Sequence, residues 1–285
     1  MAKTEQTPPE PTPHDPAPRE SPAQDPEPQG SATDEGAAQG PPRLTRLTFH
    51  GPIGEARAAR WVERLAPQLA GGGLVLDIGC GWGELMLRLL AAAPQARGVG
   101  LDLNAADLAR GRANAAARGL DGRAEFVEGD ASAAAYGPAD VVLCLGASQA
   151  LADDMAAALA ALRARVRPGG RVLLGEGFWE REPTAAELAA SWPGATAADH
   201  TDLATLVDTA IAAGFRPAWV ESADHAEWDD FESGYQAGVE EWLAAHPSHP
   251  LAAETRARAD THRAAWLRGY RNVLGIAYLT LVPVE

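Results

Sequence analysis

The chemistry of this sequence concentrates in the stretch VLDIGCGWG, where an acid and three glycines follow one apolar run. Asp77 closes the run, and Gly79, Gly81 and Gly83 come after it at alternate positions. Glycines at such a bend let the backbone approach a ligand closely, with φ values that a side chain would forbid. The spacing differs from the G-x-G-x-x-G of dinucleotide sites, and Glu84 puts a negative charge where a diphosphate would lie. We therefore expect a ligand with a positive centre and no phosphate.

Two further acids end later strand-like segments. Asp102 ends GVGLD, where a carboxylate can accept hydrogen bonds from both hydroxyls of a ribose. Asp130 ends FVEGD, where it could accept a hydrogen bond from the exocyclic amine of a base. A nucleoside with a cationic amino-acid tail and no phosphate is S-adenosylmethionine, which is the ligand that these charges predict.

The segments that must position these acids alternate between strand-like and helical patterns. Such alternation implies parallel strands joined by crossover helices, which cover both faces of the sheet and leave the strand-end acids at its ligand-binding edge. Asn104, Ser148 and Thr184 stand where helix caps are expected. The predicted strands are, in chain order, residues 74–78, 96–104, 124–130, 139–146, 168–179, 216–222 and 273–282.

VLDIGCGWG, GVGLDLN and FVEGDA resemble the three cofactor motifs of the class I S-adenosylmethionine-dependent methyltransferases, in that family's order. ADVVLCLGASQAL and VRPGG resemble its fourth strand and the turn before its fifth. The resemblance covers roughly residues 54–220 and the last strand. It implies an α/β, Rossmann-like doubly wound sheet of seven strands with an antiparallel last strand. Residues 225–272 have a helical pattern, and we expect them to form a lid inserted before that strand, within a methyltransferase domain of residues 43–285.

The resemblance also implies a role for each residue of the cofactor motifs. Leu145 and Gly146 would form the wall beneath the sulfonium of S-adenosylmethionine. No metal would be required. The methionine moiety, the ribose and the adenine would contact, in that order, Asp77, Gly79, Cys80, Gly81 and Gly83; Asp102 and Leu103; and Asp130 and Ala131.

The segment GEGFWERE is one candidate for the site of the methyl acceptor. Glu176, Phe178 and Trp179 leave the carboxyl end of the fifth predicted strand and would face the ligand crevice. We expect Glu176 to act as a general base or to orient the acceptor. The alternative is an acid paired with a nearby arginine or with a helix end.

The late helical region is the second candidate. Trp228, Phe231 and Tyr235 recur there at helical spacing, which is typical of packing but would also suit an aromatic acceptor pocket on the inner face of a lid. His50 could reach the same cleft as a catalytic residue, with a capping or core role as the alternative. His246, His249 and His262 lack the accompanying acids of a metal site, so a surface position is expected.

Composition separates the first 42 residues from the rest of the chain. They hold eleven of the 22 prolines and eight acids against two bases, which predicts a disordered, acidic leader. The formal net charge of −15 disfavours nucleic-acid partners, because an acidic surface repels phosphates. No stretch is long and apolar enough for a membrane span, and two cysteines predict free thiols in a reducing cytoplasm.

These features predict a cytoplasmic enzyme that moves a methyl group from S-adenosylmethionine to an oxygen or nitrogen of a small-molecule acceptor. Two alternatives remain open. One is a non-catalytic module that binds S-adenosylmethionine or another nucleoside. The other is an NAD-dependent oxidoreductase, which Asp77 and the missing third dinucleotide glycine oppose.

Overall fold

The computed structural model describes residues 40–133 and 136–284. The predicted acidic leader, residues 1–42, lies outside this range except for its last three residues.

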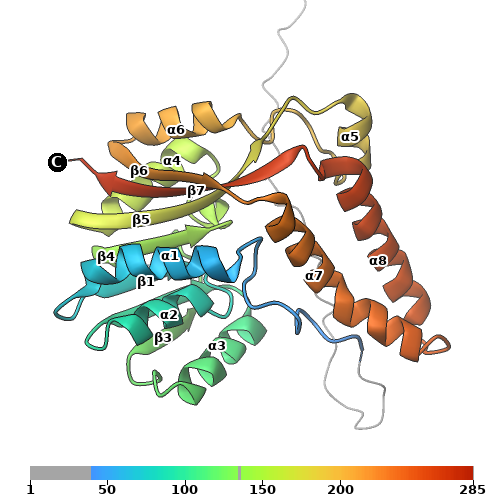
Figure 1. Cartoon of the computed structure of the whole chain (residues 1–285), viewed down its shortest axis with the longest axis horizontal. Coiled ribbons are helices and arrows are strands. Elements are labelled where there is room, and N and C mark those ends of the chain that lie inside the picture. Colours follow the sequence, from blue (N-terminus) through green and yellow to red (C-terminus); the bar gives the residue numbers. More distant parts are fainter. Residues whose placement is uncertain (1–39, 134–135, 285) are drawn as a thin grey trace, which may run out of the picture.

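A seven-stranded sheet forms the centre of the molecule, in the order β3-β2-β1-β4-β5-β7-β6 (Figure 1). Neighbouring strands from β3 to β5 pair in parallel, whereas β7 runs antiparallel to both β5 and β6. The predicted fold class, including the antiparallel last strand, is confirmed. The strands are β1 Leu74–Ile78, β2 Arg97–Asp102, β3 Ala124–Glu128, β4 Ala139–Leu145, β5 Val166–Trp179, β6 Phe215–Ser222 and β7 Leu274–Pro283.

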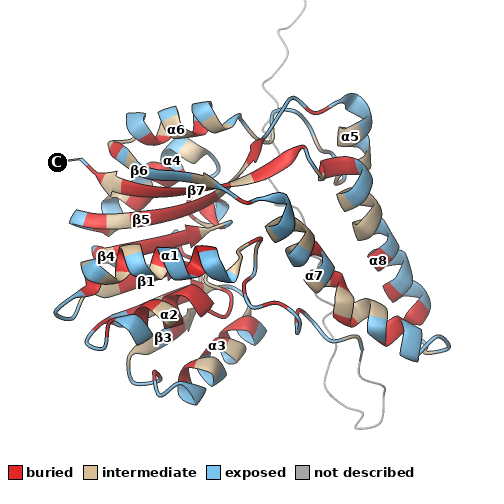
Figure 2. Cartoon of the chain, viewed as in Figure 1, coloured by how far each residue is buried: buried red, intermediate tan, exposed pale blue. Residues whose placement is uncertain are grey.

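Helices cover both faces of this sheet, and its central strands β1, β4, β5 and β7 are mostly buried, which Figure 2 shows in red. The cluster on one face joins sheet residues such as Val141 and Leu143 to α1, α2 and α3. The cluster on the other face joins Val142 and Leu174 to α4 and α6. Burial on both faces explains why β4 reads as a continuous apolar run. The five helices are α1 Glu55–Leu65, α2 Glu84–Ala92, α3 Ala105–Ala117, α4 Met155–Arg165 and α6 Leu203–Ala212.

Local side-chain caps explain where several helices begin. The side chain of Asn104 accepts hydrogen bonds at the start of α3, and Thr184 forms a capping box with Glu187 at the start of α5, Ala185–Ala190, as predicted. The predicted helix start at Ser148 is wrong. Ser148 opens only a short 3₁₀ turn, because its hydroxyl donates to a glutamate on β5, and Asp154 caps α4 instead.

The predicted helical region before the last strand is a pair of helices. Helix α7, His225–Ala245, and helix α8, Ala252–Ala265, lie between β6 and β7 in the chain. They stand beside the carboxyl ends of the parallel strands, to the right in Figure 1. A π-helical turn, Trp266–Tyr270, ends α8 and leads into β7. No helix in the described part of the chain combines the length and apolar character that a membrane crossing requires.

Candidate active site

The glycine bend between β1 and α2 forms the floor of the candidate site. Gly79, Gly81 and Gly83 have φ values of 62°, 53° and 65°, a region that side chains rarely adopt. At Gly79, a Cβ atom would lie only 2.3 Å from the Cβ of Ala147, the residue that follows β4 by two positions. The bend therefore brings its backbone directly against the segment that follows β4.

A hollow opens above this bend and encloses about 400 Å³, including the solvent at its mouth. Its lining brings together five of the predicted site residues: His50, Asp77, Gly79, Cys80 and Leu145. The other lining residues, which the sequence did not single out for the cofactor, are Phe49, Ile53, Trp82, Glu84 and Leu85.

Asp77 gives the hollow a buried carboxyl that can become charged when a cation lies beside it. Only 6% of the residue is exposed, and within the described part of the chain no basic side chain forms an ion pair with it. Burial, reinforced by the nearby charge of Asp102, raises the pKa of Asp77 to about 8. A buried acid without a positive partner fits a ligand that brings its own cation, such as the ammonium group of S-adenosylmethionine.

Asp102, at the end of β2, connects the glycine bend to the second strand. Its carboxylate accepts hydrogen bonds from the backbone N–H of Gly81 at 2.7 Å and of Asn104 at 2.8 Å. The side chain of neighbouring Leu103 lies on the outside, with 73% of the residue exposed. Asp102 thus fixes the shape of the bend and also stands beside the hollow.

Asp130 and Ala131 follow β3, and neither lines the hollow. Asp130 is exposed, and its hydrogen bonds with Ser132 lower the pKa of its carboxyl. Ala131 is buried against the cluster that contains β4 and α4. The predicted adenine contact at these two residues stays a prediction.

The segment before α1 covers the hollow from the amino-terminal side. The ring of His50 stacks on Trp82 with 5.3 Å between ring centroids, and the guanidinium of Arg110 lies 3.8 Å from the Trp82 ring. The Trp82 indole also donates to the carbonyl of Thr48 at 2.8 Å. The protein atoms around His50 desolvate its ring and lower its pKa, so the imidazole is neutral at pH 7.

Glu176 lies near the carboxyl end of β4, because β5 pairs with that strand in parallel. Its carboxylate accepts a hydrogen bond of 2.6 Å from the hydroxyl of Ser148. The N–H of Gly146 donates to the carbonyl of Gly175 at 2.8 Å, which holds the two strand ends together. Leu145, Gly146 and Glu176 are thereby brought to one edge of the sheet. Ser148 was missed as a site residue, because a serine in a loop carries no distinguishing pattern.

Phe178 and Trp179 do not line the hollow, contrary to the expectation that they face the ligand crevice. Phe178 packs in the core cluster of the sheet face that carries α4 and α6. Trp179 is buried among the aromatic residues near the π-helical turn, and its indole donates to the carbonyl of Ala197 at 2.9 Å. Both side chains therefore pack against other parts of the protein. The sequence pattern alone could not show which residues would cover them.

Helix α7 contacts the cofactor bend through its aromatic residues. Phe231 and Tyr235 pack against a cluster formed by Trp82 and two leucines, Leu44 and Leu47, of the amino-terminal segment. Trp228 packs against the core beneath α1 and also against the aromatic cluster that contains Trp179. The helix therefore covers the bend. Its regularly spaced aromatic residues pack against the core and also border the site.

A buried carboxylate inside the helical pair was missed by the sequence. Glu232 of α7 is only 2% exposed, and it accepts a hydrogen bond of 2.8 Å from the hydroxyl of Tyr270. Its other oxygen lies 2.7 Å from Nε2 of His262 on α8. The expected surface position is therefore wrong for His262, whose ring also stacks on Tyr235. The partners of Glu232 come from α8 and the π-helical turn, so its burial follows from tertiary contacts alone.

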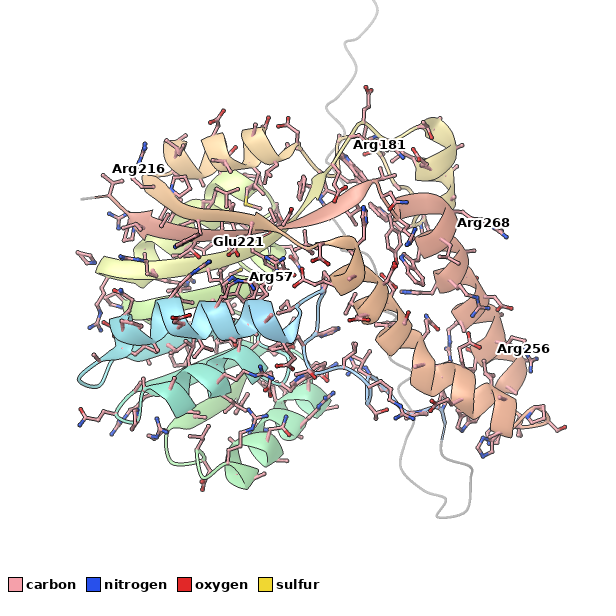
Figure 3. The ribbon with its side chains drawn as sticks, viewed as in Figure 1. Arg57, Arg181, Arg216, Glu221, Arg256 and Arg268 are labelled. Carbon is pink, nitrogen blue, oxygen red and sulfur yellow. The ribbon has the colours of Figure 1, made fainter. Side chains whose placement is uncertain are left out.

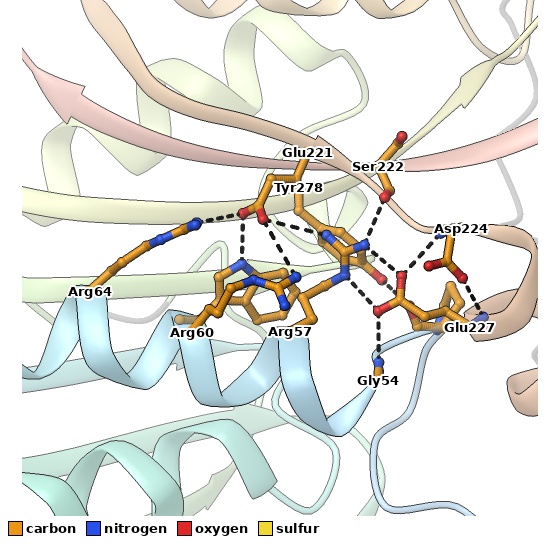
Figure 4. A network of polar contacts seen from close by, with 11 residues as sticks. Gly54, Arg57, Arg60, Arg64, Glu221, Ser222, Asp224, Glu227 and Tyr278 are labelled. Carbon is orange, nitrogen blue, oxygen red and sulfur yellow. Dashed lines mark hydrogen bonds and ion pairs between the residues drawn. The ribbon is translucent and has the colours of Figure 1, made fainter.

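An ion-pair network joins the first turn of α7 to α1 (Figure 4). Arg57 donates to both oxygens of Glu227, at 2.7 Å and 2.6 Å, and to the carbonyl of Ser222 at 2.8 Å. Glu227 also accepts from the N–H of Gly54 at 3.0 Å. In Figure 3, Arg57 and Glu221 point toward one another between α1 and β6, whereas most of the other labelled arginines lie at the periphery. The network ties the helical pair to the segment that enters the cofactor hollow.

Comparison with known proteins agrees with this geometry. A family model described as a methyltransferase domain matches residues 75–170. The Escherichia coli (strain K12) protein YjhP, described as uncharacterized, is 29% identical over 82% of this chain and 93% of its own length. A crystal structure of a SAM-dependent methyltransferase from Geobacter sulfurreducens in complex with S-adenosyl-L-homocysteine is 27% identical, with a TM-score of 0.73, and the match covers 86% of this chain and 99% of that one. A Thiobacillus denitrificans methyltransferase with the same ligand is also 27% identical, with a TM-score of 0.72, over 86% of this chain and 100% of its own.

The strand order, the acids at the strand ends and these relatives together define the class. Residues 75–170 match a methyltransferase domain, and the fold with its relatives supports an S-adenosylmethionine-dependent methyltransferase whose cofactor is S-adenosylmethionine. The family that the sequence motifs resemble is thereby confirmed.

Proposed function

We propose that this methyltransferase acts on an oxygen or nitrogen of a small-molecule acceptor. The observation that carries the proposal is the hollow itself, which is lined by His50, by Leu145 and by Asp77, a buried acid with no ion pair among the described residues. The net charge of −15 also favours a small acceptor over a nucleic acid.

We assign each cofactor contact as the resemblance of the sequence motifs implies it. Asp77 pairs with the ammonium group, while the backbone of Gly79, Cys80, Gly81 and Gly83 follows the methionine moiety. The ribose hydroxyls meet Asp102, with Leu103 at the rim, and the adenine meets Asp130 and Ala131. Leu145 and Gly146 lie beneath the sulfonium.

Methyl transfer requires alignment of an acceptor with the cofactor and an outlet for its proton. When bound, S-adenosylmethionine supplies a methyl group that is activated by its sulfonium for in-line attack. We assign proton removal from the acceptor to Glu176, whose carboxylate the hydroxyl of Ser148 holds at the end of β5. The neutral imidazole of His50 borders the cofactor hollow, and we assign it to accept a proton or to orient the acceptor.

The helical pair α7–α8 is proposed to be a lid within the methyltransferase domain of residues 43–285. Phe231 and Tyr235 already rest on Trp82 of the cofactor bend, which supports this role. Trp228 is the aromatic residue of α7 that borders both the core near the hollow and the aromatic cluster of the lid, so we retain it as an acceptor contact. Phe178 and Trp179 are assigned to packing instead.

Replacing Glu176 with glutamine tests the assignment of the proton acceptor. Glu176→Gln keeps the size and the hydrogen bond with Ser148 but removes the basic carboxylate. Turnover should fall by about 10²–10⁴-fold for an oxygen or nitrogen acceptor that must lose a proton. Turnover is measured as the transfer of a radiolabelled methyl group to a panel of phenols, amines and carboxylic acids. The affinity for S-adenosylhomocysteine should stay unchanged.

Ser148→Ala is the matched control, because it removes the partner but leaves the base. It should reduce turnover less than Glu176→Gln does. Equal turnover of wild type and Glu176→Gln would remove the proposed role. Cofactor binding without transfer to any acceptor in the panel would favour a non-catalytic binding module.

A further inference from the structure

Arg110 of α3 directs its hydrogen bonds to the segment that covers the cofactor hollow. Its guanidinium donates to the backbone carbonyls of Leu44 at 3.0 Å and Leu47 at 2.7 Å, and lies 3.8 Å from the centre of the Trp82 ring. No acid among the described residues forms an ion pair with it. A guanidinium presents five donors in a rigid fork, which suits it to hold two carbonyls at once. Arg110 therefore ties α3 to the amino-terminal segment, residues 40–50.

Leu44 has a backbone conformation that a side chain disfavours. Its φ angle is 53°, in the left-handed region that residues other than glycine rarely adopt. Such a conformation persists only where the surrounding structure holds it, and it occurs often at functional sites. The hydrogen bond from Arg110 and the burial of the Leu44 side chain beside Trp82 supply this support. The turn also brings Leu47 onto the same ring, because the N–H of Leu47 donates back to the Leu44 carbonyl at 3.3 Å.

Helix α7 contacts the same segment through two glycines that lie about one helical turn apart. A Cβ atom at Gly234 would lie 2.7 Å from Cδ2 of Leu47, and one at Gly238 would lie 3.2 Å from Cγ of Pro42. The glycines let the segment lie close to the helix, but they have no side chain that could bind its carbonyls. Close packing against α7 therefore leaves the conformation of the segment to its polar contacts.

The other side-chain links of the segment are weaker than those of Arg110. Arg43 pairs with Asp107 at 2.8 Å, and Arg46 pairs with Glu241 at 2.5 Å. The two arginine side chains are 50% and 56% exposed, and solvent-exposed ion pairs contribute little to stability. Neither pair reaches a backbone carbonyl of the turn at Leu44. Arg110 is thus the residue that fixes this turn.

The place of His50 at the hollow depends on the same set of contacts. The His50 ring stacks on Trp82 with 5.3 Å between ring centroids and an interplanar angle of 11°. The indole of Trp82 donates to the carbonyl of Thr48, two residues before His50. Trp82 is therefore held by Arg110 and by the segment that ends in His50. Since Trp82 and His50 both line the hollow, a shift of the segment would change the cofactor site directly.

We propose that Arg110 is a positioning residue of the cofactor site. It holds the amino-terminal segment in the one conformation in which Leu44 and Leu47 cover Trp82 and the ring of His50 borders the hollow. S-adenosylmethionine then binds against a cover that is already in place. The part that His50 takes in methyl transfer rests on the proposed function, whereas the positioning of the segment can be tested without turnover.

Substitutions in α3 test this role through the affinity for S-adenosylhomocysteine. Arg110→Met keeps an unbranched apolar stem but removes the donors, so the affinity of the full chain should fall about tenfold. Arg110→Lys retains the charge without the fork, so its affinity should lie between the two. Arg112→Met is the matched control, because the Arg112 guanidinium donates to the carbonyl of Phe126 at 2.7 Å and not to the segment. It should bind as the wild type does in isothermal titration calorimetry.

The titration of His50 separates a positioning role from a loss of stability. In the full chain, labelled with ¹³C-histidine and saturated with S-adenosylhomocysteine, His50→Gln identifies the signal of this ring among the seven histidines. Burial lowers the pKa of His50 below its ordinary value of 6.5. Arg110→Met should raise this pKa, because it removes a positive charge and admits water to the ring, and Arg112→Met should not. The charges that act on this pKa are those of Asp107, Arg43, Asp102 and Arg110.

Two results would overturn the assignment. In one, Arg110→Met binds S-adenosylhomocysteine as tightly as the wild type and leaves the pKa of His50 unchanged. In the other, Arg112→Met loses as much affinity as Arg110→Met, which would mean that any disturbance of α3 has this effect. If Arg110→Met does not fold, the same two measurements on Arg110→Lys decide. If methyl transfer fails with every acceptor while Arg110→Met still changes both measurements, the proposed function is contradicted and the positioning role is not.

Discussion

At the scale of single residues, Asp77 defines the chemistry of the cofactor hollow. Its pKa is raised to about 8 by burial and by Asp102, so the carboxyl is mainly protonated at pH 7 when no ligand is bound. An ammonium group beside it would favour the charged form and lower this pKa again. Cofactor binding at pH 7 should therefore release a proton.

This proton release predicts a pH dependence of cofactor binding. The affinity for S-adenosylhomocysteine should rise as the pH increases from 6 toward about 8 and then level, because Asp77 is already charged at higher pH. Isothermal titration calorimetry in buffers of different ionisation enthalpy measures the affinity and the proton count. The Asp77→Asn variant should bind S-adenosylhomocysteine more weakly, and its affinity should not rise between pH 6 and about 8. A wild-type affinity that is flat or falls over the same range would contradict the role of Asp77.

The cofactor-free protein should show the opposite trend in stability. The pKa of Asp77 in the folded state lies above its ordinary value of 3.8, so the folded state binds more protons than the unfolded state between 3.8 and about 8. The contribution of Asp77 to the free energy of unfolding is therefore present at low pH and is lost as the pH rises through about 8. Urea unfolding of wild type and Asp77→Asn isolates this contribution.

Residues whose role depends on their immediate neighbours in the sequence could be predicted. Residues whose role depends on contacts between distant segments could not. The roles of Asp77 and the glycines follow from the local pattern of a strand that ends in a bend, without knowledge of distant contacts. Trp82 stacks on His50 and Glu232 is buried by Tyr270 only because distant segments meet. Neither has a pattern in the chain that distinguishes it from a packing tryptophan or a solvated helix acid.

At the scale of elements, the attachment of α7 to α1 determines where the lid stands. Arg57 and Glu227 are both largely buried, with 7% and 11% of their side chains exposed. Although burial works to raise the pKa of Glu227, the hydrogen bonds from Arg57, Asp224 and Gly54 outweigh it and hold that pKa below its ordinary value. This ion pair is the strongest polar link between the helical pair and the sheet domain in the network of Figure 4.

Removing Arg57 should detach the first turn of the lid. Arg57→Met leaves the carboxylate of Glu227 buried without its partner, so the free energy of unfolding should fall by about 3–5 kcal/mol. Arg60→Met is the matched control on the same helix. Its side chain is half exposed and reaches Glu221 only at 4.0 Å, so the change should stay within about 0.5 kcal/mol. Urea unfolding measures both.

Equal effects of the two substitutions would contradict this attachment. A loss of cofactor affinity in Arg57→Met at a pH and temperature where it remains folded would further support the role of α7 as a cover. Arg60→Met should retain wild-type affinity.

Helices and strands were predicted well where the hydrophobic periodicity and the capping residues indicate the same boundaries. The strands and the caps at Asn104 and Thr184 follow from short-range patterns, and the structure confirms them. The predicted helix cap at Ser148 is wrong because the hydroxyl of this residue donates to Glu176. This contact joins the loop after β4 to β5 and cannot be read from a local pattern. The late helical region divides into α7 and α8 at a turn that contains Pro247 and Pro250, residues that interrupt a helix.

At the scale of the whole molecule, the amino-terminal segment contains two parts with different roles. Residues 1–39 are rich in proline and acids, a composition that cannot bury an apolar core. Leu44 and Leu47 are buried against Trp82, and His50 borders the cofactor hollow. The described part of the chain begins at residue 40, and the leader boundary at residue 42 stays a prediction.

Two truncations test this boundary. Removal of residues 1–39 should leave the melting temperature and the affinity for S-adenosylhomocysteine unchanged. Removal of residues 1–50 also deletes two buried leucines and the cover of Trp82, so the free energy of unfolding should fall by at least about 3 kcal/mol and the affinity should drop. Calorimetric scanning and titration measure both. A large loss in the shorter truncation would contradict the predicted leader.

The central claim is that the crevice at the strand ends carries acids because it receives a phosphate-free adenosine derivative with a cationic amino-acid tail. Calorimetric titration of the purified chain with S-adenosylhomocysteine and, separately, with NAD tests this claim most directly. The account predicts saturable binding of S-adenosylhomocysteine at one site per chain and no measurable binding of NAD. Binding of NAD with no response to S-adenosylhomocysteine would contradict it.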